Sequence, residues 1–157
     1  KPLVLVLGGA KVSTKLELIH KYLQQADTII IGGGMIFTFL KSMGYNIGKS
    51  LVEDDFLKLA LEILVEAKKQ NVKLHLPVDS LCSKEFSNDS ERYIRPIFSI
   101  PDNEMGLDIG SETIKILKES CIRHEVPIVG GNVSLYNATD NVSIQPTPIL
   151  LMVSILQ

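Results

Sequence analysis

The 157-residue chain lacks several features that would assign a protein to a class at once. Its only two cysteines, Cys82 and Cys121, lie in unlike contexts and form no CxxC pair, so neither a disulfide framework nor zinc-ligand spacing is indicated. No basic leader precedes an apolar segment, and no uninterrupted apolar run reaches the roughly 18 residues that span a bilayer. We therefore expect a cytoplasmic protein with reduced thiols and no membrane association.

The chain also lacks an excess of charge of either sign. The 16 basic and 18 acidic residues give a net charge of -2, and no block of lysine or arginine supplies the basic stripe of a nucleic-acid or acidic-membrane binder. The 45% apolar and 22% charged residues are typical of one ordinary soluble domain, so small molecules are the expected partners. Because the chain opens on Lys1 with an apolar run, we expect it to be a piece of something longer.

Short apolar runs that end in glycine alternate with amphipathic segments along the chain. The patterns predict strands at 3–7, 27–34, 72–78, 126–131 and 146–156, and helices at 11–24, 35–42, 53–70 and 108–120. The polar stretch 80–103 is irregular, with a strand interrupted by Pro96 that belongs at a sheet edge or in a loop. This order predicts a three-layer α/β domain of Rossmann-like type, with a mostly parallel sheet and helices on both faces.

Several polar residues are expected to serve the ends of helices. Glu53, Asp54 and Asp55 could form a metal cluster, but the helix dipole explains three acids in a first helical turn better. Gly44 and Asn71 are expected to stop the second and third helices, and Ser111 to cap the fourth. Asp79 and Asp108 are expected to cap backbone N–H groups. His20, His75 and His124 have no companion at metal spacing, so no metal site is predicted.

The segment "LGGAKVSTK" at 7–15 admits two interpretations. Gly8 and Gly9 let a backbone approach a ligand closely, and Lys11 and Lys15, four residues apart in the first turns of the predicted helix, would share a face toward a polyphosphate. Alternatively, the glycines only make a tight turn and the lysines are solvated. The segment is neither a Walker A loop nor a dinucleotide-binding fingerprint, and the spacing leaves both interpretations open.

Five segments carry a resemblance to a known family. "LGGAKVSTK", "IIIGGGMIFTFL", "GYNIGKSLVEDD", "LPVD" and "IPDNEMGLDIGSETI" follow one another over residues 1–119. Together they resemble the C-terminal, nucleotide-binding domain of phosphoglycerate kinase. The resemblance implies adenine nucleotide, ADP or ATP with Mg²⁺, as ligand, and a phosphoryl transfer with 1,3-bisphosphoglycerate in a cleft between two domains.

The resemblance also implies roles for individual residues. Lys11 would bind the nucleotide phosphates, and Lys15 would face the transferring phosphoryl group and so be the catalytic lysine. The adenine side would be lined by Gly9, Gly33, Gly34, Leu51, Phe86, Gly106 and Leu107. Thr14 stands where the family pattern GGAKVSDK has aspartate.

Beyond residue 120 the resemblance changes. The chain has no tryptophan and carries "EVPIVGGNVSLYNAT" where the kinase family continues into a WNGP-like segment. Residues 121–156, with "PIVGGNVSLYN" and "PTPILLMV", are similar to formylglycinamidine ribonucleotide synthase, although Ala138 replaces a usual glutamate. That similarity implies weak polar contacts from Asn132, Ser134 and Asn137. The chain is thus interpreted as a chimera, recombined or engineered, of a 1–119 part and a 120–157 part in one domain.

Two functions follow as hypotheses. In one, the chain binds adenine nucleotide through Gly9, Lys11, Lys15 and Gly33–Gly34 without complete phosphotransferase activity, because half a cleft cannot position both reactants. In the other, it is a folding product or scaffold without a ligand. The sheet would be truncated or re-paired at its C-terminal edge, and an unfinished edge leaves a homodimer open.

Overall fold

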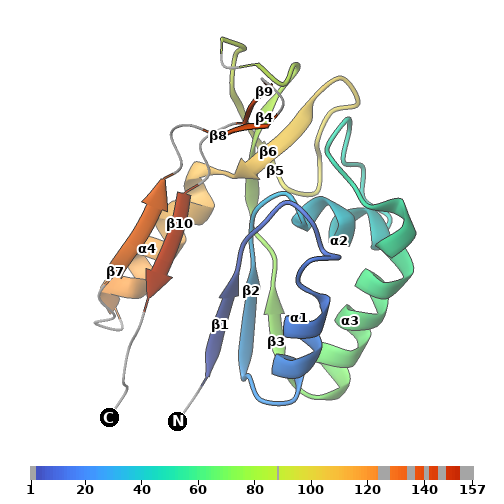
Figure 1. Ribbon diagram of the computed structural model, residues 1–157, viewed down its shortest axis with the longest axis vertical. Coiled ribbons are helices and arrows are strands. Elements are labelled where there is room, and N and C mark those ends of the chain that lie inside the picture. The colour runs from blue at the N-terminus through green and yellow to red at the C-terminus, as the bar shows by residue number, and fades with distance from the viewer. Residues whose placement is uncertain are drawn as a thin grey trace.

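The computed structural model describes residues 3–87, 89–123, 128–133, 137–139, 142–144 and 148–152. A three-stranded parallel sheet forms its centre, with β1 (Val4–Leu7), β2 (Thr28–Ile31) and β3 (Lys73–His75) in the order β1-β2-β3 (Figure 1). Branched apolar residues dominate β1 and β2. Ile29 and Ile31 of β2 are fully buried, whereas Val4 and Val6 of β1 are exposed. The strands predicted at 3–7, 27–34 and 72–78 are therefore confirmed, each with shorter bounds.

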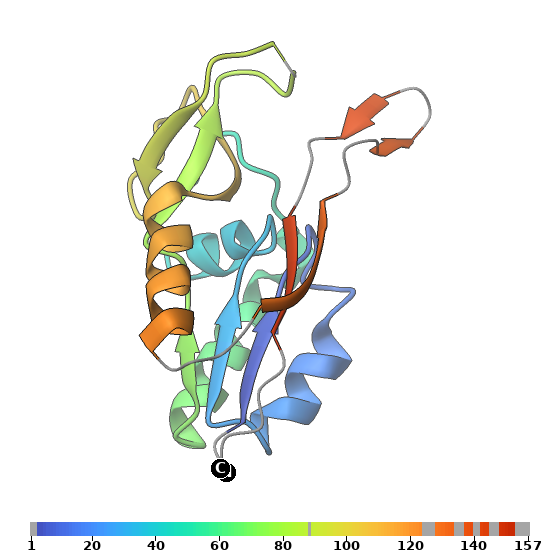
Figure 2. The ribbon, with the colours of Figure 1, turned by 90° about the vertical axis from the view of Figure 1, so that its left-hand side faces the viewer.

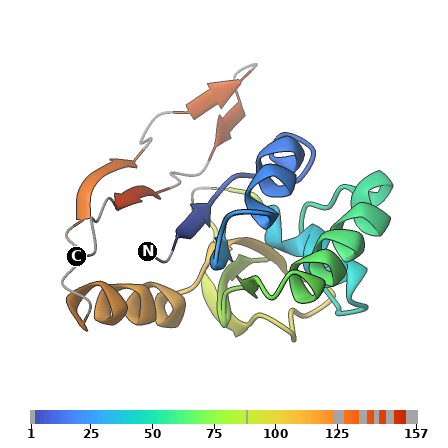
Figure 3. The same cartoon turned by 90° about the horizontal axis from the view of Figure 1, so that it is seen from below.

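Helices lie on both sides of this sheet. On one side are α1 (Leu16–Leu23) and α3 (Leu57–Lys69), which contact each other, and on the other side is α4 (Ser111–Arg123) (Figure 3). The predicted three-layer α/β fold is confirmed. Among the described residues, none of the helices combines the length and the apolar character needed to cross a bilayer.

The helix α2 (Ile36–Ser42) is the most deeply placed element. Its residues 36–40 are all buried, and Phe37 and Phe39 are among the largest fully buried side chains. A helix that is covered on every side needs a nearly continuous apolar sequence, and "IFTFL" supplies one. Gly44 (φ +85°) ends this helix and Asn71 (φ +57°) follows α3, as the sequence predicted.

Two predicted helices start later than expected. The helix predicted at 11–24 begins only at Leu16, because the preceding residues form a turn in which the N–H of Lys15 donates to the Val12 carbonyl at 2.8 Å. The helix predicted at 53–70 begins with the 3₁₀ turn η1 (Asp54–Phe56), and α3 follows it. Glu53 precedes this turn in an extended conformation, so only two of the three acids belong to the first turn.

A second, antiparallel sheet occupies the stretch predicted to be irregular. Its order is β5-β4-β6, with β4 (Asp79–Ser83) between β5 (Tyr93–Pro96) and β6 (Met105–Ile109). The strand carrying Pro96 does lie at the sheet edge, as expected, but β4 and β6 were not predicted. Helix α4 follows β6 and contacts β4 (Figure 2). Consequently the helix predicted at 108–120 starts at Ser111, after a strand.

The C-terminal strands pair with each other. The strand β7 (Ile128–Val133) runs antiparallel to β10 (Pro148–Met152), and β8 (Asn137–Thr139) pairs with β9 (Val142–Ile144). The predicted strands at 126–131 and 146–156 correspond to β7 and β10, although parts of both ranges lie outside the described residues. Of the weak polar candidates, Asn132 is in β7, Asn137 begins β8, and Ser134 lies outside the described residues.

Candidate functional site

The ends of β1 and β2 meet in a backbone-to-backbone contact, which we call the glycine corner (Gly9, Gly33 and Gly34). Gly33 has φ +71°, and a Cβ atom there would stand 2.6 Å from the nitrogen and 2.7 Å from the oxygen of Gly9. The N–H of Met35 donates to the Gly9 carbonyl at 2.9 Å. Only glycine permits this approach and this conformation, so the packing of the two turns requires glycine at position 33.

The two lysines do not share a helix face, contrary to the sequence prediction. Lys11 is exposed in the turn before α1, where its carbonyl accepts the Thr14 hydroxyl at 3.0 Å. Lys15 directly precedes α1 and is half-buried. A Cβ on Gly9 would lie 3.5 Å from Cε of Lys15, so this side chain folds back over the glycine corner. The turn, rather than helical periodicity, therefore sets where the two ammonium groups lie.

The turn is fixed from a distance by Glu53. One carboxylate oxygen of Glu53 accepts the Ser13 hydroxyl at 2.6 Å and the other accepts the Ser13 N–H at 3.1 Å, while the Glu53 N–H donates to the Thr38 hydroxyl at 3.2 Å. Burial raises the pKa of Glu53, but the hydrogen bonds from Ser13 outweigh it, so the pKa lies below its usual value. Glu53 thus holds the turn between β1 and α1, which carries Lys11 and Lys15, and does not act as a helix-dipole residue.

The C-terminal end of β6 lies at the glycine corner, and its N-terminal end lies toward the expected adenine side. A Cβ on Gly32 would lie 3.6 Å from the Ile109 side chain, and the Ile109 N–H donates to the Asp108 carboxylate at 2.7 Å. Burial raises the pKa of Asp108, although the N–H groups of Ile109 and Gly33 lower it in part. Asp108 therefore accepts a backbone N–H, that of Ile109, in agreement with its expected role.

Gly106 is a packing residue inside the core. A Cβ at this position would overlap the Phe37 ring, and the Gly106 N–H donates to the Ser50 hydroxyl at 2.8 Å. The next residue along β6, Leu107, is half-buried. Since β-strands rise about 3.3 Å per residue, β6 spans about 7–10 Å between the Gly33 contact and the Ser50 contact.

Leu51 and Phe86 are the exposed apolar members of the expected adenine side. Leu51 follows Ser50, which binds Gly106, and its side chain is 57% exposed. Phe86 is 51% exposed and follows β4, whose Ser83 pairs with Met105 of β6. The structure thus brings Leu51 beside β6, and places Phe86 just beyond the end of the neighbouring strand.

Asp79 caps backbone N–H groups, as the sequence predicted, and these groups belong to α4. Its carboxylate, 5% exposed, accepts the N–H of Glu112 at 2.9 Å and both the N–H and the hydroxyl of Thr113 at 2.8 and 2.6 Å. The prediction that Ser111 caps this helix was wrong, because Ser111 is its first residue and the cap comes from β4. The sequence did not show that the helix capped by Asp79 is α4, because Asp79 and Thr113 are 34 residues apart.

The described residues fit a magnesium ion only if the ion is bound together with the phosphates of a nucleotide. In the part of the chain that the structure describes, no three His, Cys, Asp or Glu side chains gather to hold a metal ion. Mg²⁺ is commonly bound through one or two carboxylates together with substrate phosphates and waters, which requires no protein cage. A groove of about 650 Å³ between α1 and α3 lies elsewhere and includes none of the glycine-corner residues.

An α/β domain with helices on both sides of a parallel sheet, whose strands end in two interlocked glycine turns, belongs to the Rossmann-like class of α/β folds. Comparison with known proteins narrows this class, since the family model for phosphoglycerate kinase matches residues 1–137. The chain therefore belongs to the phosphoglycerate kinase family. Phosphoglycerate kinase of Chloroherpeton thalassium is 45% identical over 136 residues, and that of Lactobacillus delbrueckii subsp. bulgaricus is 52% identical over 119 residues.

Solved structures agree with this assignment. The structure of phosphoglycerate kinase from Coxiella burnetii matches with a TM-score of 0.72 and 41% identity over 78% of this chain, and that from Pyrococcus horikoshii with 0.60 and 25% over 78%. The chain spans about a third of its curated relatives, 34% of the Chloroherpeton protein and 28% of the Lactobacillus one. The family match extends past residue 119, and the comparisons give no support to a synthase-like segment or to a chimera.

Proposed function

We propose that the chain binds an adenine nucleotide, ADP or ATP with Mg²⁺, as a nucleotide-binding part of a phosphoglycerate kinase. The observation that carries the proposal is the contact of Gly33 with Gly9 at the carboxyl ends of adjacent parallel strands, with the Lys15 side chain folded over it. Ligands of open α/β sheets bind at this edge, and two nearby ammonium groups favour an anion.

In this proposal, different residues contact the phosphates and the base of the nucleotide. Lys11 and Lys15 bind the phosphates, with Lys15 nearer to the glycine corner. Leu51 and Phe86 offer exposed apolar surface to the base, and Leu107 follows Gly106 along β6 beside them. Gly9, Gly33 and Gly34 keep side chains out of the space where the nucleotide approaches the backbone, and Gly106 lets β6 pack on Phe37. Mg²⁺ neutralises phosphate charge when it is bound.

Complete phosphoryl transfer is not part of the proposal. The reaction depends on positioning and charge stabilisation on both sides of the transferred group, and this chain spans about a third of its relatives. Thr14, which replaces the aspartate of the family pattern, donates its hydroxyl to the Lys11 carbonyl and so serves the turn. The chain alone therefore holds nucleotide without the second reactant.

Calorimetric titration of Mg-ADP and Mg-ATP into the chain tests the proposal. The double variant Lys11→Ala/Lys15→Ala should lose binding, because it removes both positive charges from the site. The matched control Lys68→Ala/Lys69→Ala removes two lysines from the far end of α3 and should bind like the unchanged chain. Absence of binding at millimolar nucleotide, or equal loss in both double variants, would favour the alternative of a scaffold without a ligand.

A further inference from the structure

The segment that carries Leu51 is held to one neighbouring turn by successive residues. Gly48 has φ +56°, and a Cβ on it would overlap the carbonyl oxygens of Pro101 and Glu104. The Lys49 N–H donates to the Glu104 carbonyl at 2.8 Å, and the Ser50 hydroxyl accepts the Gly106 N–H at 2.8 Å. The position of Leu51 therefore depends on where the turn 101–104 lies.

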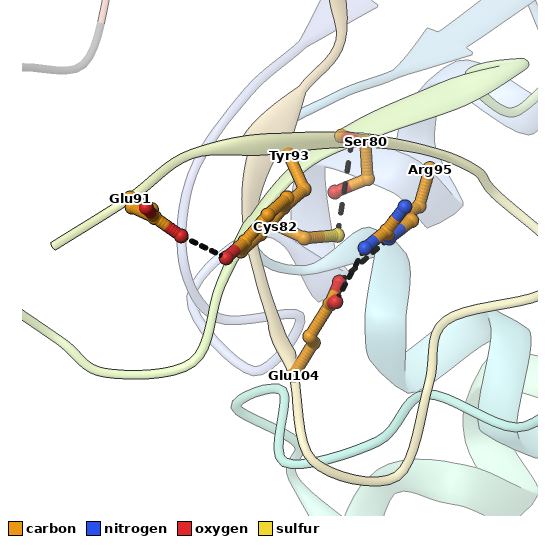
Figure 4. A network of polar contacts seen from close by, with 6 residues as sticks. All are labelled: Ser80, Cys82, Glu91, Tyr93, Arg95 and Glu104. Carbon is orange, nitrogen blue, oxygen red and sulfur yellow. Dashed lines mark hydrogen bonds and ion pairs between the residues drawn. The ribbon is translucent and has the colours of Figure 1, made fainter.

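That turn is fixed by an ion pair with β5. Arg95 donates through Nε to one oxygen of the Glu104 carboxylate at 2.8 Å and through Nη2 to the other at 2.6 Å (Figure 4). The Glu104 side chain is only 4% exposed, so its charge is shielded from water and depends on this partner. Bidentate pairs of this kind fix the carboxylate in orientation as well as in distance.

The guanidinium is itself held in place from the other side. Its central carbon lies 4.9 Å from the centre of the Tyr93 ring, whose hydroxyl donates to Glu91 (Figure 4). Nζ of Lys84 lies 5.7 Å from the centre of the same ring. Burial keeps the neighbouring Cys82 thiol protonated by raising its pKa. Arg95 thus lies between the Tyr93 ring and the Glu104 carboxylate, and through Glu104 it holds the turn 101–104 that contacts the Gly48–Leu51 segment.

We infer that Arg95 is a positioning residue for the base of the bound nucleotide, acting through Glu104 and the 48–50 backbone on Leu51. This inference rests on the proposed function and adds to it a residue that touches no ligand. The phosphate end of the site is built by β1, β2 and the Ser13–Glu53 bonds, none of which involves Arg95. Loss of Arg95 should therefore weaken the binding of the base and leave the binding of the phosphates unchanged.

The test compares two ligands on three variants by calorimetry, with ADP as the complete ligand and inorganic tripolyphosphate as the phosphate-only probe. Arg95→Ala should raise the Kd for ADP about tenfold and leave that for tripolyphosphate within about twofold. Arg95→Lys, which keeps one charged contact with Glu104, should fall between Arg95→Ala and the unchanged chain. Lys84→Ala removes a charge over the same ring while sparing the Glu104 pair, and should bind ADP normally.

Backbone hydrogen exchange at residues 48–51 adds a readout that does not need the ligand. The Lys49 amide should exchange faster in Arg95→Ala, because its acceptor belongs to the released turn. Equal weakening of ADP and tripolyphosphate, with binding intact in the unchanged chain, would overturn this inference alone. Failure of the unchanged chain to bind ADP would overturn the proposed function and the inference together.

Discussion

Ser13 donates both its hydroxyl and its backbone N–H to the carboxylate of Glu53, a residue 40 positions further along the chain. Because Glu53 also donates its N–H to Thr38 of α2, the turn between β1 and α1 is connected through Glu53 to the most deeply buried helix of the fold. The turn that carries Lys11 and Lys15 thereby acquires a fixed position before any ligand arrives, which lowers the entropic cost of binding.

The first prediction concerns this attachment. Ser13→Ala removes the hydroxyl donor from the Glu53 carboxylate and should lower the free energy of unfolding by about 1–2 kcal/mol. The lowered pKa of Glu53 means that its stabilising contribution is full above the usual value of 4.5 and is lost as the pH falls through the lower folded-state value. Urea unfolding measured across acid pH should therefore show the variant and the unchanged chain converging as the pH decreases. A constant difference would contradict this assignment.

The second prediction tests the contact between the two glycine turns. Gly33→Ala adds both the strain of φ +71° and a Cβ 2.6 Å from the Gly9 nitrogen, so we expect a loss of more than about 3 kcal/mol. Gly44→Ala is the matched control, because its φ is +85° and a Cβ there meets nothing within 4 Å. The control should lose only about 1–2 kcal/mol. Equal losses in denaturant titrations would show that the contact itself has no energetic weight.

Sequence patterns predicted the elements whose cause is local. The apolar runs that end in glycine gave β1 and β2, and the positions of Gly44 and Asn71 marked where helices end, because backbone conformation is decided by the residue itself. The strands β4 and β6 escaped prediction since their residues include buried polar groups. Ser80 donates to the carbonyl of Asp108, 28 residues away, and no periodicity reveals such a partner.

The candidate site likewise combines residues that a local motif indicates with contacts between residues far apart in the sequence. Gly9, Gly33 and the lysines were indicated by a short motif, whereas Ser13–Glu53 and Arg95–Glu104 appear only once the chain is folded. The helix predicted from Lys11 failed because the turn after β1 needs its own hydrogen bonds before α1 can begin at Leu16.

A third prediction concerns the cap of α4. Asp79→Asn exchanges one carboxylate oxygen for an NH₂ group, which would face the N–H of Glu112 or the groups of Thr113 without an acceptor. We expect a loss of about 2–3 kcal/mol in the free energy of unfolding, from one broken charged hydrogen bond and one unsatisfied donor. Asp89→Asn makes the same change of charge on an exposed loop and should be nearly neutral. The measurement is urea unfolding followed by circular dichroism. If both variants unfolded at the same urea concentration, Asp79 would not be the cap that stabilises α4.

The last prediction follows from Asp108, the carboxylate beside the glycine corner that accepts the Ile109 N–H and whose pKa the Gly33 N–H lowers. Burial holds its pKa above the usual value of 3.8, so its charge destabilises the fold at neutral pH, and this cost disappears once the pH falls below the unfolded value. Asp108→Asn keeps an oxygen for the N–H of Ile109 and removes the charge. Its melting temperature should therefore exceed that of the unchanged chain at pH 7 by a few degrees, on the order expected for about 1 kcal/mol, and match it near about pH 3.

The same substitution separates stability from ligand binding. Asp108 places a negative charge next to the turn that the phosphates would approach, so Asp108→Asn should bind ADP at least as tightly as the unchanged chain. Weaker ADP binding with a raised melting temperature would mean that the carboxylate serves the ligand, through Mg²⁺ or directly, at a cost to the fold. A lowered melting temperature at pH 7 would instead show that its interactions with the Ile109 and Gly33 N–H groups need the full charge, because the amide oxygen is the weaker acceptor.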